Sequence, residues 1–168
     1  MSITQPTLIL DATQISQKIN RLAYQIYENN FDEEQLLICG IAERGFLLAQ
    51  KVYEKLKEIS PFSLELSKVV LDKENLHADT ISLQPSIQNL QNKAVILCDD
   101  VLYTGKTLAY AAVPFLTANA KKLQCLVLIH RNHLHFPIQP TYIGMELATT
   151  LQEHVSVKLD AEESVFLG

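Results

Sequence analysis

The sequence predicts a single α/β domain with a central, mostly parallel sheet flanked by helices. Short apolar runs of strand length recur at 36–41, 94–98 and 123–129. Segments with apolar residues at helical spacing lie between these runs. Strands that alternate with helices favour a parallel sheet with right-handed crossovers. At 168 residues, with 48% hydrophobic and 20% charged residues, the chain has the size and composition of one globular domain.

The first half of the chain is expected to hold two helices and two buried strands. Asp11 is the predicted N-cap of the first helix, in which apolar residues recur at helical spacing as far as Tyr27. Gly45 marks the turn that opens the second helix, and Pro61 ends that helix. In chain order, we expect a short apolar lead at 7–10, a helix at 11–27, a strand at 36–41, a helix at 46–56 and a strand at 63–71.

The second half begins with a segment that has no clear periodicity. Residues 72–91 are polar at first and are interrupted by Pro85, which predicts a long, weakly structured insertion. Such insertions in compact domains are often lids over a binding site, and a hairpin without a role is the alternative. The remaining expected elements are a strand at 94–98, a helix at 108–116 that Pro114 shortens or kinks, a strand at 123–129 and shorter strand-like pieces within 142–159.

The segment 95–107, VILCDDVLYTGKT, gives the clearest indication of function. Residues typical of a buried strand lead directly into Asp99 and Asp100, and a short loop then leads into the hydroxyl-rich helix start 104–107. Because adjacent side chains of an extended segment diverge, the two carboxylates can address two neighbouring groups of one ligand. Backbone N–H groups at the start of the following helix favour a phosphate. The segment therefore predicts a ligand with both vicinal hydroxyls and a phosphate, such as a ribose 5-phosphate.

Two other interpretations of this segment stay open. The residues 105–107 match the end of the nucleotide P-loop, G-x-x-x-x-G-K-[ST], but Asp100 stands where the first glycine of that motif would be. A carboxylate at a position where backbone must approach polyphosphate argues against an ATPase. In the other interpretation, this is an ordinary strand-to-helix turn in which Asp100 or Thr104 only caps the helix. The paired acids, the glycine and the two hydroxyls exceed what a cap requires.

Composition argues against several other classes of protein. No apolar run reaches the ~18 residues of a membrane span, and the start of the chain, 1–5, lacks the basic and apolar regions of a signal peptide. Cys39, Cys98 and Cys125 lie in apolar runs and are expected to be buried, without a metal or a disulfide. We therefore expect a cytoplasmic protein. The net charge of −5 argues against a surface that attracts nucleic acid throughout.

The motif 95–107 resembles the phosphoribosyl pyrophosphate signature of the type I phosphoribosyltransferases, in which strand residues lead into two acids and a Thr-Gly-x-Thr loop. Its second half, 101–107, most resembles the pyrimidine operon attenuators that double as uracil phosphoribosyltransferases. The other segments that resemble this group, in the family's order, are Asp11 with its helix, 40–45, 130–133, 136–138 and 142–144. The resemblance covers roughly residues 8–159. It implies the fold of that family, with a flexible lid and a small base-binding hood.

For the sugar phosphate, the resemblance implies that Asp99 and Asp100 accept hydrogen bonds from the ribose hydroxyls, directly or through water and a metal ion. The 5-phosphate is implied to bind backbone N–H groups of 103–107 and the hydroxyls of two threonines in that loop. Lys106 either helps there or points to solvent. The residues implied to contact the sugar phosphate along this loop are Leu102, Tyr103, Thr104, Gly105, Lys106 and Thr107, of which the first two shape the loop.

A second anion site, for pyrophosphate, is implied for the backbone of Ala42, Glu43 and Gly45 with the guanidinium of Arg44. The family often holds this loop in a cis peptide, which here would join Ala42 and Glu43. Glu43 departs from the attenuator group, and a carboxylate beside pyrophosphate is unfavourable unless it points away or helps a metal. Arg44 as a plain surface arginine is the alternative. Mg2+ is the implied cofactor and would enter bound to pyrophosphate, with Asp99 as a candidate protein contact.

Lys73 is the expected lid residue. The attenuator group usually has an arginine near the start of its lid, where this chain has Asp72 and Lys73, so positive charge is present without a bidentate fork. The implied reaction is displacement at the anomeric carbon by a base nitrogen, through a transition state that resembles an oxocarbenium ion. The protein positions the reactants, neutralises the leaving group and excludes water, and no nucleophilic residue is required.

The base pocket is implied for His130, Arg131 and Ile143, and Arg131 is also implied to meet pyrophosphate. His130 stands where the attenuator group has an acid and the purine salvage enzymes have a lysine, and a histidine can donate or accept a hydrogen bond. Leu134 replaces a basic residue typical of the attenuators. A metal site formed by the three histidines of 130–135 is a poor alternative, because no Cys, Asp or Glu joins them at ligand spacing.

Together these residues favour an enzyme that transfers phosphoribose to a nucleobase, with uracil as the first choice. The alternatives are a nucleotide-sensing, RNA-binding regulator on the same fold and a purine phosphoribosyltransferase. The acidic charge disfavours RNA, so phosphoribosyl pyrophosphate and a nucleobase are the expected partners. Glu43, Asp72 and Leu134 leave open whether catalysis is retained. Apolar residues such as Phe115 and Leu116 permit a dimer, and we expect a homo-oligomer that binds no membrane.

Overall fold

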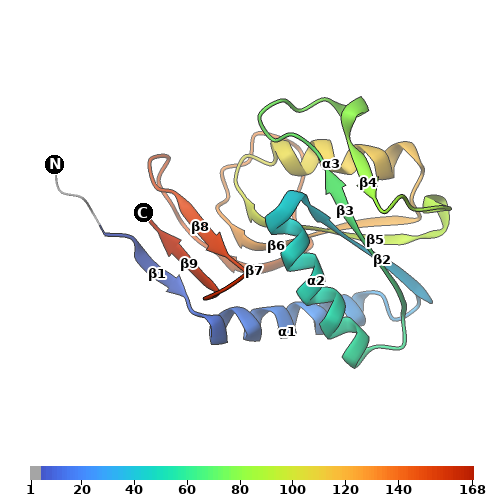
Figure 1. Cartoon of the computed structure of the whole chain (residues 1–168), viewed down its shortest axis with the longest axis horizontal. Coiled ribbons are helices and arrows are strands. Elements are labelled where there is room, and N and C mark those ends of the chain that lie inside the picture. The colour runs from blue at the N-terminus through green and yellow to red at the C-terminus, as the bar shows by residue number, and fades with distance from the viewer. Residues whose placement is uncertain (1–4) are drawn as a thin grey trace.

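The computed structural model describes residues 5–168 and contains two sheets and three α-helices over that range (Figure 1). Residues 1–4, which contributed to the expectation of no signal peptide, lie outside the described part. In chain order the elements are β1 (Thr7–Leu10), α1 (Ala12–Asn29), β2 (Gln35–Ile41), α2 (Ala42–Ile59), β3 (Ser63–Val70), η1 (Ala78–Thr80), β4 (Ser82–Gln84), η2 (Leu90–Asn92), β5 (Ala94–Leu102), α3 (Lys106–Thr117), β6 (Lys122–His130), β7 (Tyr142–Glu146), β8 (Val155–Lys158) and β9 (Ser164–Leu167).

The larger sheet has the strand order β4-β3-β2-β5-β6-β7. Its five strands β3, β2, β5, β6 and β7 are parallel, and the short edge strand β4 pairs antiparallel with β3. The predicted mostly parallel sheet is therefore confirmed. The helices that connect its strands cover both faces, which is why its strands are nearly continuous apolar runs.

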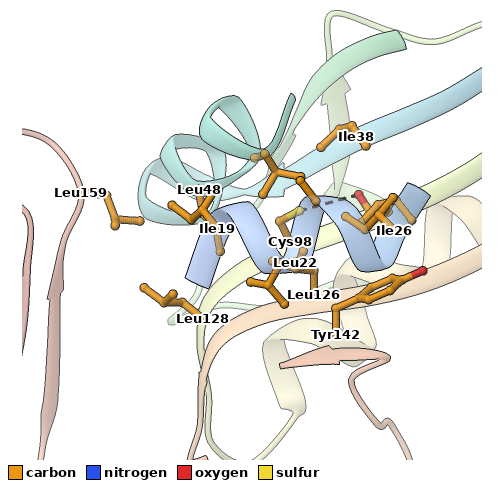
Figure 2. Close-up of a cluster of buried hydrophobic side chains, with 14 of the residues drawn as sticks. Ile19, Leu22, Ile26, Ile38, Leu48, Cys98, Leu126, Leu128, Tyr142 and Leu159 are labelled. Atoms are coloured by element: carbon orange, nitrogen blue, oxygen red, sulfur yellow. Dashed lines mark hydrogen bonds between the residues drawn. The ribbon is translucent and has the colours of Figure 1, made fainter. Parts of the chain in front are cut away.

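Alternate residues of the central strands face different helices. In β2, Leu36 and Ile38 belong to the core cluster on the side of α1 and α2, whereas Leu37 and Cys39 belong to the cluster on the side of α3. Figure 1 shows α1 and α2 together on one face of the sheet. Figure 2 shows the first cluster, whose labelled residues are Ile19, Leu22, Ile26, Ile38, Leu48, Cys98, Leu126, Leu128, Tyr142 and Leu159. Because successive strand residues face opposite sides of the sheet, the domain has three layers, with one core cluster on each face of the sheet.

The first helix begins as predicted. The Asp11 side chain accepts the N–H of Gln14 at 2.8 Å, and the Gln14 side chain accepts the N–H of Asp11 at 2.9 Å. This reciprocal capping box satisfies N–H groups that have no partner inside the helix. The third helix, predicted at 108–116, spans Lys106–Thr117, so Pro114 does not end it early. Phe115, which is fully buried against the sheet, anchors its last turns.

The predicted lid, residues 72–91, is more ordered than its sequence suggested. It contains β4 and the turn η1, and β4 extends the main sheet through its pairing with β3. The Ser67 hydroxyl of β3 donates to the Pro85 carbonyl at 2.7 Å, and apolar lid residues pack on the α3 side of the core. This order was not visible in the residue pattern, because a three-residue edge strand has no periodicity of its own.

A second, three-stranded sheet has the order β1-β9-β8 and is antiparallel. It stands beside the main body, and in it β1, near the start of the described residues, pairs with β9, which ends at Leu167 (Figure 1). The region 142–159 thus contains the expected strand pieces as β7 and β8. Sequence reasoning missed β9 and described β1 only as an apolar lead.

The three cysteines are free and buried, one each in β2, β5 and β6. Burial raises the pKa of the Cys125 thiol to about 12 and raises that of Cys39 further still. They are therefore small core residues, as predicted. Within the described residues, no helix is both long and apolar enough to cross a membrane. Of the two residues named for a dimer contact, Phe115 is buried inside the chain, and Leu116 is 63% exposed.

Candidate active site

The strand ends that carry the predicted site residues meet at one edge of the main sheet. The neighbouring strands β2, β5, β6 and β7 end there at Ile41, Leu102, His130 and Glu146. The strand register pairs Leu102 with His130 and His130 with Glu146. The chain leaves β2 for β3 on one side and returns to β5 on the other, so the strand order reverses between β2 and β5. Ligands of open α/β sheets bind at such a point, outside the carboxyl ends of the strands.

The turn after β5 is formed around Gly105. Its φ of 86° lies in the left-handed region that glycine adopts without steric cost, and a Cβ there would lie 2.8 Å from Ile138 Cγ2. The carbonyl of the preceding residue, Thr104, accepts the N–H groups of His135 at 2.8 Å and Phe136 at 3.3 Å. The segment after β6 therefore packs against this turn and fixes its backbone.

This turn lines a cavity of about 190 Å³, together with Lys73, Asp99 and the rest of 101–108. The helix α3 begins at Lys106, so the N–H groups of its first turn, which have no partner within the helix, adjoin the cavity. An anion is favoured at this position by those N–H groups and by the helix dipole. The Lys106 side chain is exposed.

Asp99 and Asp100 lie inside β5 rather than beyond its end, because the strand continues to Leu102. They are only 4% and 5% exposed, and Asp99 lines the cavity whereas Asp100 does not. Asp99 Oδ1 accepts the N–H of Asp100 at 2.9 Å and lies 3.9 Å from Lys73 Nζ. Burial, and then the charge of Asp100, raise the pKa of the Asp99 carboxyl well above its usual value, and Lys73 acts in the opposite direction.

The segment predicted to bind pyrophosphate is the first turn of α2, not a separate loop. The helix begins at Ala42, directly after β2, so Gly45 lies within it instead of at a preceding turn. The peptide between Ala42 and Glu43 is trans, and Ala42 has a left-handed φ of 50°. A Cβ at Gly45 would lie 2.8 Å from the Cys98 carbonyl and 3.2 Å from Asp99 Oδ1. A glycine therefore lets the start of α2 lie directly against the acidic strand.

The Glu43 carboxylate is held by a lysine that the sequence did not single out. Lys68 of β3 donates to Glu43 Oε1 at 2.7 Å, and its Nζ lies 5.2 Å from the centre of the Phe46 ring. The ammonium balances the charge that made Glu43 unfavourable beside pyrophosphate. Arg44 is exposed and forms no ion pair within residues 5–168. The one signal for Lys68 is its place near the carboxyl end of β3, next to the strand that precedes Glu43.

A larger cavity of about 450 Å³ lies at the ends of β6 and β7. Its lining residues are His130, Arg131, Asn132, His133, Glu146, Leu147, Ala148 and Thr149. His130 is buried, and neither of its ring nitrogens has a hydrogen-bond partner within the described residues. The Tyr103 ring of the phosphate turn lies 5.4 Å from the His133 ring, which places the two cavities side by side.

Ile143 does not line this cavity, and its place in a base pocket stays a prediction. It lies near the start of β7, packs on the α3 side of the core, and its carbonyl accepts Arg21 at 3.1 Å. The residues of this segment that reach the cavity are 146–149, three positions further along. Sequence reasoning missed them because the register of β7 on β6 decides which residue reaches the sheet edge.

Arg131 binds the segment 149–153 after β7, called the hood segment below. Its guanidinium donates to the Thr149 hydroxyl at 2.9 Å and to the carbonyls of Thr150 and Glu153 at 3.1 and 2.8 Å. The same guanidinium stacks 4.0 Å from the centre of the Tyr103 ring. Its contact with pyrophosphate stays a prediction. Arg131 joins Tyr103, next to the Gly105 turn, to the backbone of the hood segment.

The remaining residues around β6 have structural contacts. His133 Nε2 lies 2.9 Å from the Thr149 carbonyl, and Leu134 packs over the phosphate turn, with Cδ2 3.4 Å from the place of a Cβ on Gly105. Within residues 5–168, no three His, Cys, Asp or Glu side chains are grouped to hold a metal ion. The donor set nevertheless fits Mg2+, which keeps several waters and needs only one or two carboxylates beside substrate oxygens. Asp99 is the carboxylate in place for it.

The fold and the site define an α/β protein that places an anion-binding helix start, a buried acid and a second polar cavity at the switch point of a parallel sheet. A sequence profile of the phosphoribosyl transferase domain matches residues 7–162. The chain belongs to this family.

Curated relatives agree with this assignment. The bifunctional protein PyrR of Clostridium kluyveri is 33% identical over 159 residues, covering 90% of this chain and 89% of the relative. The bifunctional protein PyrR of Acetivibrio thermocellus is 36% identical over 161 residues, covering 90% and 86%. The chain is thus a type I phosphoribosyltransferase similar in sequence to PyrR proteins over nearly its whole length.

Solved structures show the same fold at low sequence identity. The hypoxanthine phosphoribosyltransferase of Trypanosoma cruzi superposes with a TM-score of 0.77 at 12% identity, covering 96% of this chain and 95% of that one. A hypoxanthine-guanine phosphoribosyltransferase from Bacillus anthracis superposes with a TM-score of 0.75 at 16% identity, covering 96% of both chains. These likenesses support the fold and do not choose a base.

Proposed function

We propose that this protein transfers the phosphoribosyl group of phosphoribosyl pyrophosphate to uracil and releases pyrophosphate. The observation that carries the proposal is the cavity in which the buried Asp99 adjoins the Gly105 turn, beside a second polar cavity at the end of β6. A ring nitrogen of the base bonds to the anomeric carbon, the bond from that carbon to pyrophosphate oxygen breaks, and the N–H proton of the base is released.

The residues divide this work by position. The N–H groups of the turn and of the start of α3 hold the 5-phosphate, and Asp99 accepts a ribose hydroxyl, with Asp100 supporting it through the strand. Pyrophosphate lies at the start of α2, where Arg44 is free to meet it. Lys73, which already lies 3.9 Å from Asp99, closes the site from the lid. Charge-assisted contacts of this kind are roughly twice as strong as neutral ones.

Catalysis then depends on charge and position, because no side chain at the site acts as a nucleophile. The positive charge that develops on the sugar ring is stabilised by the ionised form of the Asp99 carboxyl, which the neighbouring Lys73 favours, and the negative charge on the leaving group by Arg44 and helix N–H groups. Mg2+, bound with the substrate, would neutralise pyrophosphate and hold its oxygens. Lid closure excludes water, so that the base and not water reacts.

Uracil is chosen because residues 101–107 most resemble the pyrimidine operon attenuators that double as uracil phosphoribosyltransferases, and the relatives carry the name bifunctional protein PyrR. The same resemblance favours a second role as a regulator. The net charge of −5 disfavours broad attraction of RNA, so such binding would need a local basic surface. A purine base is the other alternative, because the cavity at His130 does not by its size exclude one.

A base-by-base turnover assay tests the proposal. The protein is incubated with phosphoribosyl pyrophosphate, Mg2+ and, in turn, uracil, hypoxanthine, guanine or xanthine, and nucleotide and pyrophosphate are measured. We expect UMP as the main product. If only a purine is converted to nucleotide, the proposed substrate is that purine and not uracil. Failure of every base, together with no calorimetric binding of ribose 5-phosphate, would contradict the enzyme. A salt titration of RNA binding tests the regulatory role, and absence of binding at low salt removes it.

A further inference from the structure

His130 is the buried polar side chain that the rest of the structure leaves unexplained. It is 6% exposed, and both Nδ1 and Nε2 lack a hydrogen-bond partner within the described residues. An unpaired buried polar group lowers stability, so its presence in a folded protein requires a reason. Its ring lines the 450 Å³ cavity, where a ligand can supply the missing partner.

Glu146 lies beside His130 on the neighbouring strand. The register of β6 and β7 pairs the two residues, and Glu146 Oε1 lies 3.7 Å from His130 Nδ1. This separation exceeds hydrogen-bond range, so His130 and Glu146 form no hydrogen bond with each other. The Glu146 side chain is 70% exposed and stands at the rim of the cavity.

The other polar side chains with hydrogen bonds in this cavity have them within the protein. The Arg131 guanidinium donates to Thr149, Thr150 and Glu153, and His133 Nε2 contacts the Thr149 carbonyl. Asn132, which also lines the cavity, is exposed and has no side-chain hydrogen bond within the described residues. His130 is the buried side chain of this cavity that lacks a hydrogen bond, and Glu146 is the acceptor beside it.

A lactam matches this pair. In an amide unit the nitrogen and oxygen lie about 2.3 Å apart, as the C=O and C–N bond lengths require. Two nearly parallel hydrogen bonds can therefore run from these atoms to protein groups 3.7 Å apart. The carboxylate accepts the lactam N–H, and the imidazole donates to the lactam oxygen. An amino-substituted base instead directs a ring-nitrogen lone pair at the carboxylate, and two acceptors then face each other.

We propose that His130 and Glu146 together read the lactam edge of the incoming base. The inference rests on the proposed phosphoribosyl transfer and adds the residues that select its second substrate. Uracil and the 6-oxopurines share this edge, whereas cytosine and adenine lack it. The pair thus sorts oxo bases from amino bases and does not itself sort pyrimidines from purines.

Calorimetric titration of the full chain with UMP, CMP and ribose 5-phosphate tests the pair without requiring turnover. UMP and CMP share their sugar phosphate and differ only at the edge in question. We expect the protein to bind UMP more tightly than CMP, and both more tightly than ribose 5-phosphate. His130→Leu should weaken UMP binding by roughly ten- to a hundredfold and leave ribose 5-phosphate unchanged. Glu146→Gln should reduce the preference for UMP over CMP.

Thermal unfolding supplies a second measurement. His130→Leu should raise the melting temperature, because it removes an unpaired buried polar group at similar volume. The matched control is His135→Leu, since His135 is exposed and does not line the cavity. We expect this control to leave UMP binding unchanged.

The outcomes separate the two proposals. If the unaltered protein binds no ribose 5-phosphate, the proposed function fails before any variant is made. If it binds, and His130→Leu weakens UMP and ribose 5-phosphate equally or leaves UMP unchanged, the base-reading role is wrong. If His130→Leu does not fold, Glu146→Gln tests the inference, because the exposed position of Glu146 tolerates the change. An unaltered preference of Glu146→Gln for UMP over CMP overturns the inference.

Discussion

The side of the site proposed for the sugar phosphate, at the end of β5, is formed mainly by backbone, whereas the side proposed for the base, at the ends of β6 and β7, is formed mainly by side chains. On the first side, the Gly105 turn is fixed by its φ and by two N–H groups bound to the Thr104 carbonyl. On the second, His130 is unpaired and Glu146 stands at the rim. The sugar-phosphate side, called the donor side below, is thus constrained by the steric fit of its backbone. On the base side, the substitution of a single side chain can change which ligand is bound.

The largest expected effect is on the donor side. Asp99→Asn should lower kcat/KM about a hundredfold, in the range seen when one electrostatic contact to the transition state is removed. The same change should raise stability, because the buried carboxyl beside Asp100 is replaced by a neutral amide that can still accept the Asp100 N–H. Steady-state kinetics and chemical denaturation measure the two effects. Equal losses of activity and stability would show that Asp99 is structural.

The pH dependence of that stability has a definite sign. Because the folded state raises the pKa of Asp99, it keeps a proton that the unfolded chain has released. The free energy of unfolding should therefore fall as pH rises above the ordinary carboxyl value of about 3.9, by up to about 1.4 kcal/mol per pH unit until Asp99 ionises. The stability gained by Asp99→Asn should grow over the same window. A pH-independent difference would contradict the raised pKa.

Gly105→Ala should have the next largest effect. Its left-handed φ costs an alanine about 1–2 kcal/mol, and the added Cβ would approach Ile138 Cγ2 to 2.8 Å. We expect ribose 5-phosphate to bind about tenfold more weakly by calorimetry, since a kcal/mol or so is lost at the turn. Gly168→Ala is the matched control, because a Cβ there meets its neighbours at 3.5 Å or more. Unchanged binding in Gly105→Ala would remove the turn from the phosphate site.

On the base side, Arg131→Lys should change the KM for the base severalfold, whereas Gly105→Ala acts on the binding of ribose 5-phosphate. A lysine cannot reproduce the planar fork that holds Thr149, Thr150 and Glu153. Loss of these contacts loosens the hood, so the KM for the base should rise about three- to tenfold, while the KM for phosphoribosyl pyrophosphate stays constant. A change in the second KM alone would instead return Arg131 to the pyrophosphate site.

Glu43→Gln should have the smallest effect. The ion pair of Glu43 with Lys68 is largely exposed on the Glu43 side, and such pairs contribute about 0–1 kcal/mol. Stability should therefore hardly change by denaturation, while the freed Lys68 lowers the KM for phosphoribosyl pyrophosphate about twofold. Glu58→Gln, which alters an exposed ion pair away from the site, is the control. A rise in this KM would mean that Glu43 helps to bind substrate or metal.

The sequence predicted the donor side better than the base side for a physical reason. A strand, a glycine turn and a helix start within 94–107 depend on local conformation, so their pattern is visible in the sequence. Three contacts between distant segments were not visible in the sequence. The β6–β7 register, which leaves Ile143 outside the cavity lining, was unknown. The hydrogen-bond partners of Arg131 lie 18–22 residues away, and Lys68 meets Glu43 only through the pairing of β3 with β2.

The pairing of β1 with β9 also constrains how the molecule is made. Its strand β1 precedes every strand of the main sheet in the chain and β9 follows all of them, so the small sheet can be completed only after the main sheet has emerged from the ribosome. A nascent chain can thus form the Gly105 turn while the small sheet is still incomplete.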